Sequence, residues 1–262
     1  MKKQLVTALV LVGLTAAVGY AAPTALPGQG VKNSVHDMAA AVGAVDFGSN
    51  GRICAFCHTP HHAQTVGEYA PLWSRSNSNA TTTYAPYVSA TFNATLQPGF
   101  LDAAAGPTRL CMSCHDGSIA PDQHYGQAGA SALLTNDTFG GAGVGASNNL
   151  GNDHPLGFDY VAVAAGPTTG DVNTVTAQPE SGMVKNYIRQ LNSAGTDLKY
   201  ADNALQITVA ERLYNGSIMT CATCHDVHNK KNKFTVADTA TFNYLVLAPQ
   251  NGSALCLTCH IK

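Results

Sequence analysis

The 262-residue chain is close to neutral, with 14 Lys and Arg against 16 Asp and Glu and a formal net charge of -2. This balance excludes the basic surface that a nucleic-acid-binding protein needs. Charged residues make up 11% of the chain and aromatic residues 7%, so few large apolar side chains are available for a core. We therefore expect another group to fill part of the interior.

The first 21 residues have the three parts of a secretory signal peptide. "MKK" provides a basic start, "QLVTALVLVGLTAAV" an apolar run, and "GYAAP" small residues suited to cleavage after about Ala21. A retained anchor is the alternative, but the run is shorter than the ~20 residues of a membrane span. We predict residues 1–21 as a signal peptide and 22–262 as a single domain without a membrane span.

All eight cysteines belong to four copies of the pattern Cys-x-x-Cys-His, namely "CAFCH", "CMSCH", "CATCH" and "CLTCH". The cysteines are Cys54, Cys57, Cys111, Cys114, Cys221, Cys224, Cys256 and Cys259, and the histidines are His58, His115, His225 and His260. Disulfides and zinc sites both use Cys-x-x-Cys pairs. Neither requires a histidine directly after each second cysteine.

Covalent attachment of haem explains this spacing. Two thiols three positions apart reach the two vinyl groups of one porphyrin, and the adjacent imidazole becomes the proximal ligand of the iron. The motifs therefore predict four covalently attached haem c groups, with the eight cysteines as attachment points. Zinc binding and disulfide or thioredoxin-like redox chemistry are the alternatives.

The other six histidines include the candidates for the distal ligand of each iron. His61 and His228 each lie three residues after a proximal histidine, an offset that points away from the nearest iron, so we expect each to bind the iron of a neighbouring haem. His154 and His36 complete the predicted distal set. His62 is the alternative to His61.

Two further features refine this ligand set. Asp37 is expected to orient the imidazole of His36. His124 is expected to lie in a solvated loop, with replacement of a weaker distal candidate as the alternative. Met112 stands between two cysteines of one motif and does not reach the far face of its haem. All four irons are therefore predicted to carry two histidines, and such closed irons transfer electrons rather than catalyse reactions.

The segments between the motifs read mostly as loop. Trp73 is expected to pack against a haem, residues 179–193 have helical periodicity, and 204–210 and 241–248 are typical of short strands. Ser217 and Ser253 are predicted to cap the helices of the last two motifs. The expected fold class is a multihaem cytochrome c: mostly loop, with short α-helices carrying the motifs and little β-strand, wrapped round a haem stack.

Seven stretches carry a resemblance to a known family: "SVHD", "ICAFCHTPHHA", "APLW", "LCMSCHDG", "NDHPLGFDY", "CATCHDVHN" and "LCLTCH". Together they resemble the secreted tetrahaem c-type cytochromes of metal-reducing bacteria, of the OmcE type. The resemblance covers most of residues 22–262 but is specific only at these motifs. It implies extracellular filaments with haems running continuously between subunits, and distal roles for His36, His61, His154 and His228.

The predicted function is extracellular electron transfer through four bis-histidine haems, in a homopolymer at the cell surface or beyond it. The last motif ends at His260, two residues before the end of the sequence, so we expect the fourth haem near the surface, positioned to meet another haem. We favour His36 as a ligand to an iron of the adjacent subunit, with ligation of its own first haem as the alternative. Redox proteins of the cell surface and extracellular electron acceptors are the expected partners. A monomeric periplasmic tetrahaem shuttle and, less favoured, a multihaem reductase are the alternatives.

Overall fold

The structure is a computed structural model, and it includes every cysteine and every histidine of the chain among the residues that it describes. The described residues are 30–38, 52–64, 69, 71–75, 83–88, 102–125, 129, 144–165, 207–228, 245–248 and 250–260. The predicted signal peptide and the predicted helix at 179–193 lie outside these ranges. Within them, no helix is both long and apolar enough to cross a membrane.

Short helical turns joined by loop make up the described backbone. The elements are 3-10 helix η2 (Ile53–Phe56), α2 (Pro107–His115), 3-10 helix η4 (Ala146–Asn148), α3 (Tyr160–Ala165), 3-10 helix η5 (Ala210–Arg212), α4 (Cys221–Cys224), 3-10 helix η7 (Asn251–Ser253) and α5 (Ala254–Cys259). Extended pairing in the described residues consists of isolated β-bridges. The backbone has the predicted loop-rich character, and its membership of the multihaem class stays a prediction.

The two predicted strands are wrong within their described parts. In 204–210, the backbone N–H of Thr208 donates to Glu211 at 2.8 Å and that of Glu211 donates to the Thr208 hydroxyl at 3.3 Å. This reciprocal capping starts the helical turn η5 where a strand was expected. In 241–248, Leu245 has a φ of 57°, which interrupts the extended backbone and leaves one bridge, between Val246 and His225.

Each motif forms a single turn of helix that ends at its histidine. The backbone N–H of the histidine donates to the carbonyl of the first cysteine in three motifs: His58 to Cys54 at 2.8 Å, His225 to Cys221 at 2.9 Å and His260 to Cys256 at 2.8 Å. In the second motif, α2 itself ends at His115. Because residues three apart lie on the same side of a helix, both thiols of a motif lie on one side of its turn.

The predicted serine caps are only partly matched. Ser253 occupies the N-cap position of α5 without a side-chain capping bond. The N-cap of α4 is Thr220 rather than Ser217, and its backbone N–H donates to the Thr223 hydroxyl at 3.0 Å. The helix of the third motif is therefore limited to four residues, from its first cysteine to its second, Cys221–Cys224.

The first and third motifs share one backbone arrangement, which sequence comparison did not reveal. In both, a segment further along the chain passes beside the motif and pairs with it through two hydrogen bonds. These bonds are Ser74 N–H to Cys57 O (2.9 Å), Leu247 N–H to Cys224 O (2.8 Å), Thr59 N–H to Leu72 O (2.7 Å) and Asp226 N–H to Leu245 O (2.7 Å). Leu72 and Leu245 also share a left-handed backbone, with φ of 55° and 57°. The two halves of the chain thus repeat one motif-holding unit.

The apolar interior is divided into small clusters. One groups Phe158, Tyr160, Ile207, Val209, Leu213, Met219, Leu247 and Ala248; a second groups Tyr84, Ala103, Ala104, Met112 and Leu150; a third groups Trp73 and Leu110. Cysteines of the motifs pack against the edges of all three clusters. The polypeptide therefore surrounds the motifs with apolar side chains instead of building one continuous core.

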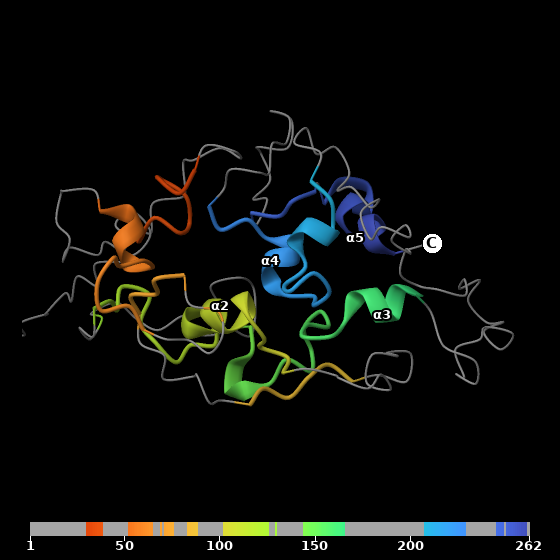
Figure 1. Cartoon of the computed structure of the whole chain (residues 1–262), viewed down its shortest axis with the longest axis horizontal. Helices are drawn as coiled ribbons and strands as arrows, with labels where there is room; N and C mark the ends of the chain where they lie inside the picture. The colour runs from red at the N-terminus through yellow and green to blue at the C-terminus, as the bar shows by residue number, and fades with distance from the viewer. Residues whose placement is uncertain are drawn as a thin grey trace, which may run out of the picture.

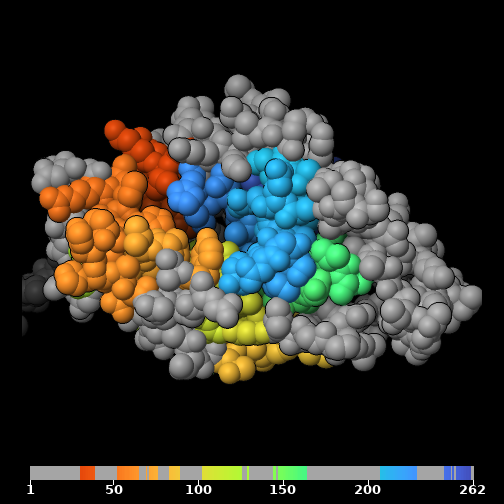
Figure 2. Space-filling model, viewed as in Figure 1, coloured from red at the N-terminus to blue at the C-terminus, as the bar shows by residue number. Residues whose placement is uncertain are grey.

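The four motif-bearing segments follow one another along the long axis of the molecule. In Figure 1, η2 (orange) lies at the left, α2 and α4 lie near the centre, and α5 (dark blue) lies toward the right. Helices α2 and α4 are in contact with each other. The space-filling view in Figure 2 places the orange first-motif segment at one end of the described surface, with residues 207–228 beside it. The motifs are thus arranged in space roughly in their order along the chain.

We expect Gly157→Ala to destabilise the fold far more than Gly216→Ala. Both glycines have left-handed backbones, with φ of 76° and 78°, a conformation that costs an alanine about 1–2 kcal/mol. A Cβ at Gly157 would also overlap the backbone of Asp102 and Ala103, whereas the space around Gly216 is open. Chemical denaturation followed by circular dichroism measures both variants; equal losses would contradict this account of the packing.

Candidate functional site

Three of the four motif histidines face a histidine from a distant part of the chain. The ring centres are 6.2 Å apart for His58 and His228, 6.2 Å for His115 and His36, and 6.3 Å for His260 and His154. In each pair, one member belongs to a Cys-x-x-Cys-His turn and the other is a predicted distal ligand. These three separations are nearly identical, although the segments involved have nothing else in common.

This separation fits two imidazoles on opposite sides of one metal ion. A metal–imidazole nitrogen bond is about 2 Å long and the ring centre lies about 1 Å beyond that nitrogen, so two such rings have centres about 6 Å apart. The angles between ring planes are 12°, 58° and 74°, and rotation of a ring about its metal–nitrogen axis leaves the separation unchanged. The residues present therefore fit an iron bound by two histidines at three sites.

Hydrogen bonds to the Nδ1 atoms orient two of these rings. The Nδ1–H of His58 donates to the carbonyl oxygen of Pro71 at 2.6 Å, and that of His154 donates to the carbonyl of Pro155 at 3.0 Å. An Nδ1–H that donates to a carbonyl leaves Nε2 as the nitrogen with a lone pair for a metal. These backbone contacts therefore select the tautomer that haem iron requires.

The expected orienting role of Asp37 is wrong. The Nδ1 atom of His36 is buried without a hydrogen-bond partner among the described residues. Asp37 instead accepts the backbone N–H of Asn33 at 2.7 Å, which closes the turn that carries His36. The position of His36 is therefore set by the backbone of residues 33–37. Its pairing with His115 of the same chain favours ligation within one chain over ligation of an adjacent subunit.

Burial keeps three of the paired imidazoles, those of His36, His115 and His154, neutral. Desolvation lowers the pKa of His36 from 6.5 to about 3, and the nearby His115, His225 and His228 add to this effect. Burial likewise lowers the pKa of His115, with a contribution from His225, and the pKa of His154, where the Pro155 carbonyl opposes the change. A histidine must be neutral to bind a metal. These three rings are therefore in the ligating state at neutral pH.

The remaining histidines divide into two groups. His225, the third proximal histidine, lies near His36 and His115 but does not belong to the three pairs. His61 and His62 are exposed, and His62 has a φ of 58°. The structure does not bring His61 into any of the three pairs, so its ligand role and the choice between His61 and His62 stay predictions.

His124 is buried, which contradicts the expectation of a solvated loop. Its side chain is 4% exposed, its Nδ1–H donates to the carbonyl of Asp122 at 2.7 Å, and its ring meets Phe56 edge-on at 5.2 Å. The sequence around it, "APDQHYGQ", is polar and gives no sign of this burial. Tertiary packing against the first motif decides the outcome.

The cysteines place neighbouring motifs side by side. Burial raises the pKa of Cys57 to about 11, with Cys114 of the second motif adding to the rise. The thiols of Cys111 and Cys221 hydrogen-bond to each other, which raises the pKa of Cys111 and lowers that of Cys221. Burial raises the pKa of Cys224 to about 12, with Cys259 of the fourth motif contributing most after burial. The motifs therefore meet in chain order: first with second, second with third, third with fourth.

The outer cysteines of this series reach the surface. Cys54 of the first motif and Cys256 of the fourth are exposed, whereas the other six are partly covered. The two terminal motifs thus offer an accessible edge, and the two central motifs are enclosed.

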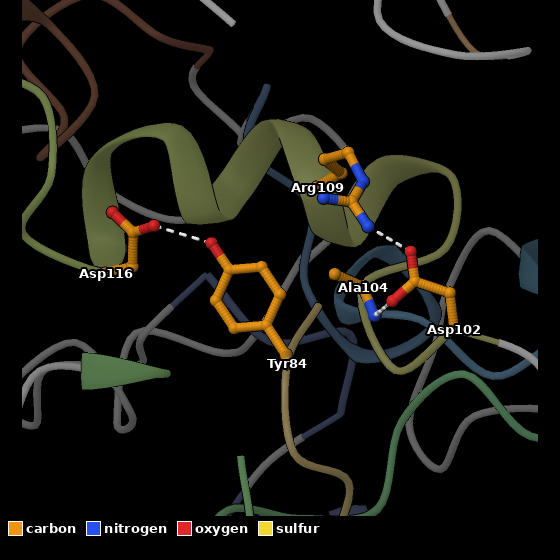
Figure 3. A network of polar contacts seen from close by, with 5 residues as sticks. All are labelled: Tyr84, Asp102, Ala104, Arg109 and Asp116. Atoms are coloured by element: carbon orange, nitrogen blue, oxygen red, sulfur yellow. Dashed lines mark hydrogen bonds and ion pairs between the residues drawn. The ribbon is translucent and has the colours of Figure 1, made fainter. Parts of the chain in front are cut away.

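A polar network braces the helix of the second motif (Figure 3). The Tyr84 hydroxyl donates at 2.5 Å to the carboxylate of Asp116, the residue directly after His115. Arg109 forms an ion pair with Asp102. Arg109 also lies over the Tyr84 ring, 5.9 Å from its centre. Both ends of α2 are thereby fixed to segments outside it, which holds the turn that carries Cys111 and His115.

Comparison with protein-family models and with curated proteins finds no match to this chain. Within the described residues, which contain every cysteine and histidine, no group of three or more Cys, His, Asp or Glu side chains is arranged to hold a metal ion. The histidines approach one another in twos instead. The chemistry of the site is therefore argued from these pairs and from the thiols beside them.

We expect the stability of the protein to be nearly constant above about pH 6.5 and to fall as the pH is lowered toward 3. The folded-state pKa of His36, about 3, is below its ordinary value of 6.5, so in this window the unfolded chain binds a proton that the folded chain does not. His115 and His154 add to the effect because their pKa values are lowered too. Thermal unfolding of the protein from pH 8 to pH 3 at constant ionic strength measures it. A midpoint that rises on acidification would contradict it.

Proposed function

We propose that this chain is a secreted tetrahaem c-type cytochrome that carries electrons outside the cell and resembles the OmcE type. The observation that carries the proposal is the set of three imidazole pairs with ring centres 6.2, 6.2 and 6.3 Å apart, each with one member in a Cys-x-x-Cys-His turn. Zinc and disulfide chemistry do not account for a second histidine opposite three of the four motif histidines. Ligation of iron by two imidazoles does.

Each residue of a motif has a different role in binding the proposed cofactor. When bound, haem supplies a one-electron couple between ferric and ferrous iron. The two thiols on one side of the helical turn would anchor the porphyrin, and the histidine that ends the turn would be one ligand of the iron. In the three pairs, the facing histidine would be a second ligand and would leave those irons without an open site for a substrate. This closure favours electron transfer over catalysis.

The order of the motifs supports a relay. The first meets the second, the second meets the third, and the third meets the fourth through their cysteines. The cysteines that reach the surface, Cys54 and Cys256, belong to the first and last motifs of this series. Electrons would therefore enter at one end of the series and leave at the other. We propose that copies of the chain meet end to end in a filament, with His61 or His62 as a further ligand.

The alternatives differ in assembly and in coordination. A monomeric periplasmic shuttle would have the same haems but no end-to-end contacts. A multihaem reductase would keep one iron five-coordinate for its substrate. Because His225 lies outside the three pairs, the choice between electron carrier and reductase depends on the iron of the third motif, whereas the choice between filament and shuttle depends on assembly.

We expect the purified protein to be red, to exceed the mass of its polypeptide by four haems, and to form filaments. The eight cysteines in four motifs provide one attachment site per haem. Intact-mass spectrometry and a pyridine haemochromogen assay count the haems, and size-exclusion chromatography with negative-stain microscopy reports assembly. A colourless protein would contradict the cytochrome proposal. A homogeneous monomer at high concentration would contradict only the filament.

We expect His228→Ala to remove one ligand of the iron bound by His58 and so to open a coordination site there. His62→Ala should leave the ligands of that iron unchanged. The His228 ring centre lies 6.2 Å from that of the motif histidine His58, whereas His62 belongs to none of the pairs. Carbon monoxide binding to the reduced protein, measured by absorbance, should increase in His228→Ala alone. His228→Met should restore a closed iron with a higher reduction potential. An increase in His62→Ala without one in His228→Ala would overturn this assignment.

A further inference from the structure

Arg75 is the largest fully buried side chain among the described residues. It is 1% exposed, and its guanidinium donates to three backbone carbonyls of the segment that follows the second motif. Nη1 donates to Pro121 and, at 2.7 Å, to Gln123, and Nη2 donates to Ala120 at 2.6 Å. These contacts wrap residues 120–123 around the end of the side chain.

The residue before Arg75 is fixed to the first motif. The Ser74 hydroxyl donates to the carbonyls of Ala55 and Phe56 at 2.9 and 3.0 Å, and its backbone N–H donates to Cys57 at 2.9 Å. The positive charge of Arg75 also acts on Cys57 and Cys114, where it opposes the rise in pKa that burial causes. Arg75 therefore lies at the junction of the first and second motifs.

The charge of Arg75 has no carboxylate partner in the described part of the chain. The ion pair found there joins Arg109 to Asp102. A buried charge without an opposite charge costs several kcal/mol, and three carbonyls supply partial negative charge only. A full negative charge from outside the polypeptide would remove this cost.

Two donors of the guanidinium remain for such a group. A guanidinium has five N–H donors, and the three carbonyls use two on Nη1 and one on Nη2. The Nε atom is buried and has no hydrogen-bond partner, and one N–H of the adjacent Nη2 is also left. Donors on adjacent guanidinium nitrogens bind the two oxygens of a carboxylate together. The porphyrin carries two propionate carboxylates on the edge opposite its two thioether bonds, so a propionate of one haem is the anion that would reach the attachment turn of a neighbouring haem.

We propose that Arg75 binds a propionate of the haem attached in the first or second motif and thereby raises the reduction potential of that haem. The inference rests on the proposed function, since it requires haem at these motifs. The physical reason is electrostatic. Ferric haem carries one positive charge more than ferrous haem, so a bare carboxylate nearby stabilises the ferric form and lowers the reduction potential. A cation that neutralises the carboxylate removes this stabilisation and raises the potential. Loss of Arg75 leaves that carboxylate uncompensated in a buried site.

The test compares Arg75→Gln, Arg75→Lys and the control Arg109→Gln in the haem-loaded protein. Arg109→Gln removes the same net charge, but its guanidinium is already paired with Asp102. Potentiometric titration reports the four midpoint potentials, and the propionate-bending bands of resonance Raman spectra report the contact itself. We expect Arg75→Gln to lower one or two midpoints and to shift a propionate band. Arg75→Lys should keep the midpoint potentials near those of the wild type, because it keeps the positive charge. It should still shift the propionate band, because lysine lacks the two adjacent N–H donors of the guanidinium.

Unchanged midpoints and bands in Arg75→Gln with four haems attached would overturn the inference and leave the cytochrome proposal standing. Equal shifts in Arg109→Gln would overturn it too, because net charge alone would then be responsible. If Arg75→Gln fails to accumulate, an unchanged propionate band in Arg75→Lys overturns it. Fewer than four haems in the wild-type protein would instead contradict the proposed function.

The two possible haems are separated by marking one iron at a time. His228→Met marks the iron opposite His58, and His36→Met marks the iron opposite His115, through the charge-transfer band of methionine-bound iron. When Arg75→Gln is combined with each of these two variants, the midpoint potential of the marked iron should fall in one of the two double variants. That variant identifies the haem whose propionate Arg75 binds. No shift of either marked iron would overturn the inference.

Discussion

The constraint on which this structure depends is that two imidazoles from distant parts of the chain must face each other at the span of one iron. His58 meets His228, His115 meets His36, and His260 meets His154, all with ring centres 6.2 to 6.3 Å apart. Each pair joins a motif turn to a loop that has no regular secondary structure to position it. The loops are therefore fixed by the pairs and by backbone hydrogen bonds more than by strands or long helices. A chain with little regular secondary structure can still adopt one defined fold when contacts between distant segments are specified in this way.

The apolar packing is likewise organised around the Cys-x-x-Cys-His motifs. In the described part of the chain, three separate clusters, each with motif cysteines packed against it, take the place of a continuous core. Clusters of this size bury little surface for the number of residues described. We infer that the porphyrin faces complete them, so that haem attachment and folding are one process. The buried and neutral imidazoles agree with this, because a pKa of about 3 for His36 represents a desolvation cost that ligation of iron would offset.

Charge inside the molecule is sparse, and its placement is specific. Arg75 is buried against backbone carbonyls at the junction of two motifs, whereas Arg109 is neutralised by Asp102 at the start of α2. In an interior of low dielectric constant, a single cation acts over several ångströms on any redox centre near it. Haems with the same two ligands would then differ in potential because of their surroundings. Such differences give direction to electron flow along a series of otherwise equivalent sites.

The sequence by itself determined the local chemistry: four Cys-x-x-Cys-His turns, each with its thiols on one side and its histidine at the end. It did so because this geometry follows from helical spacing within five residues, which no distant contact can alter. The candidate distal ligands His36, His154 and His228 were also found in this way, since histidines are few. The helical turn at Ala210–Arg212 was missed, and a strand was predicted at 204–210 instead, although the capping pattern of Thr208 and Glu211 was visible, because the apolar alternation was given more weight.

Only the tertiary structure decided which histidine faces which motif, that neighbouring motifs meet in chain order, and that His124 and Arg75 are buried. It also revealed the repeat shared by the first and third motifs, whose passing segments at 72–74 and 245–247 have little sequence in common. These features depend on the path of long loops and on backbone hydrogen bonds, which are available to any side chain. Residue type and spacing therefore leave no local trace of them.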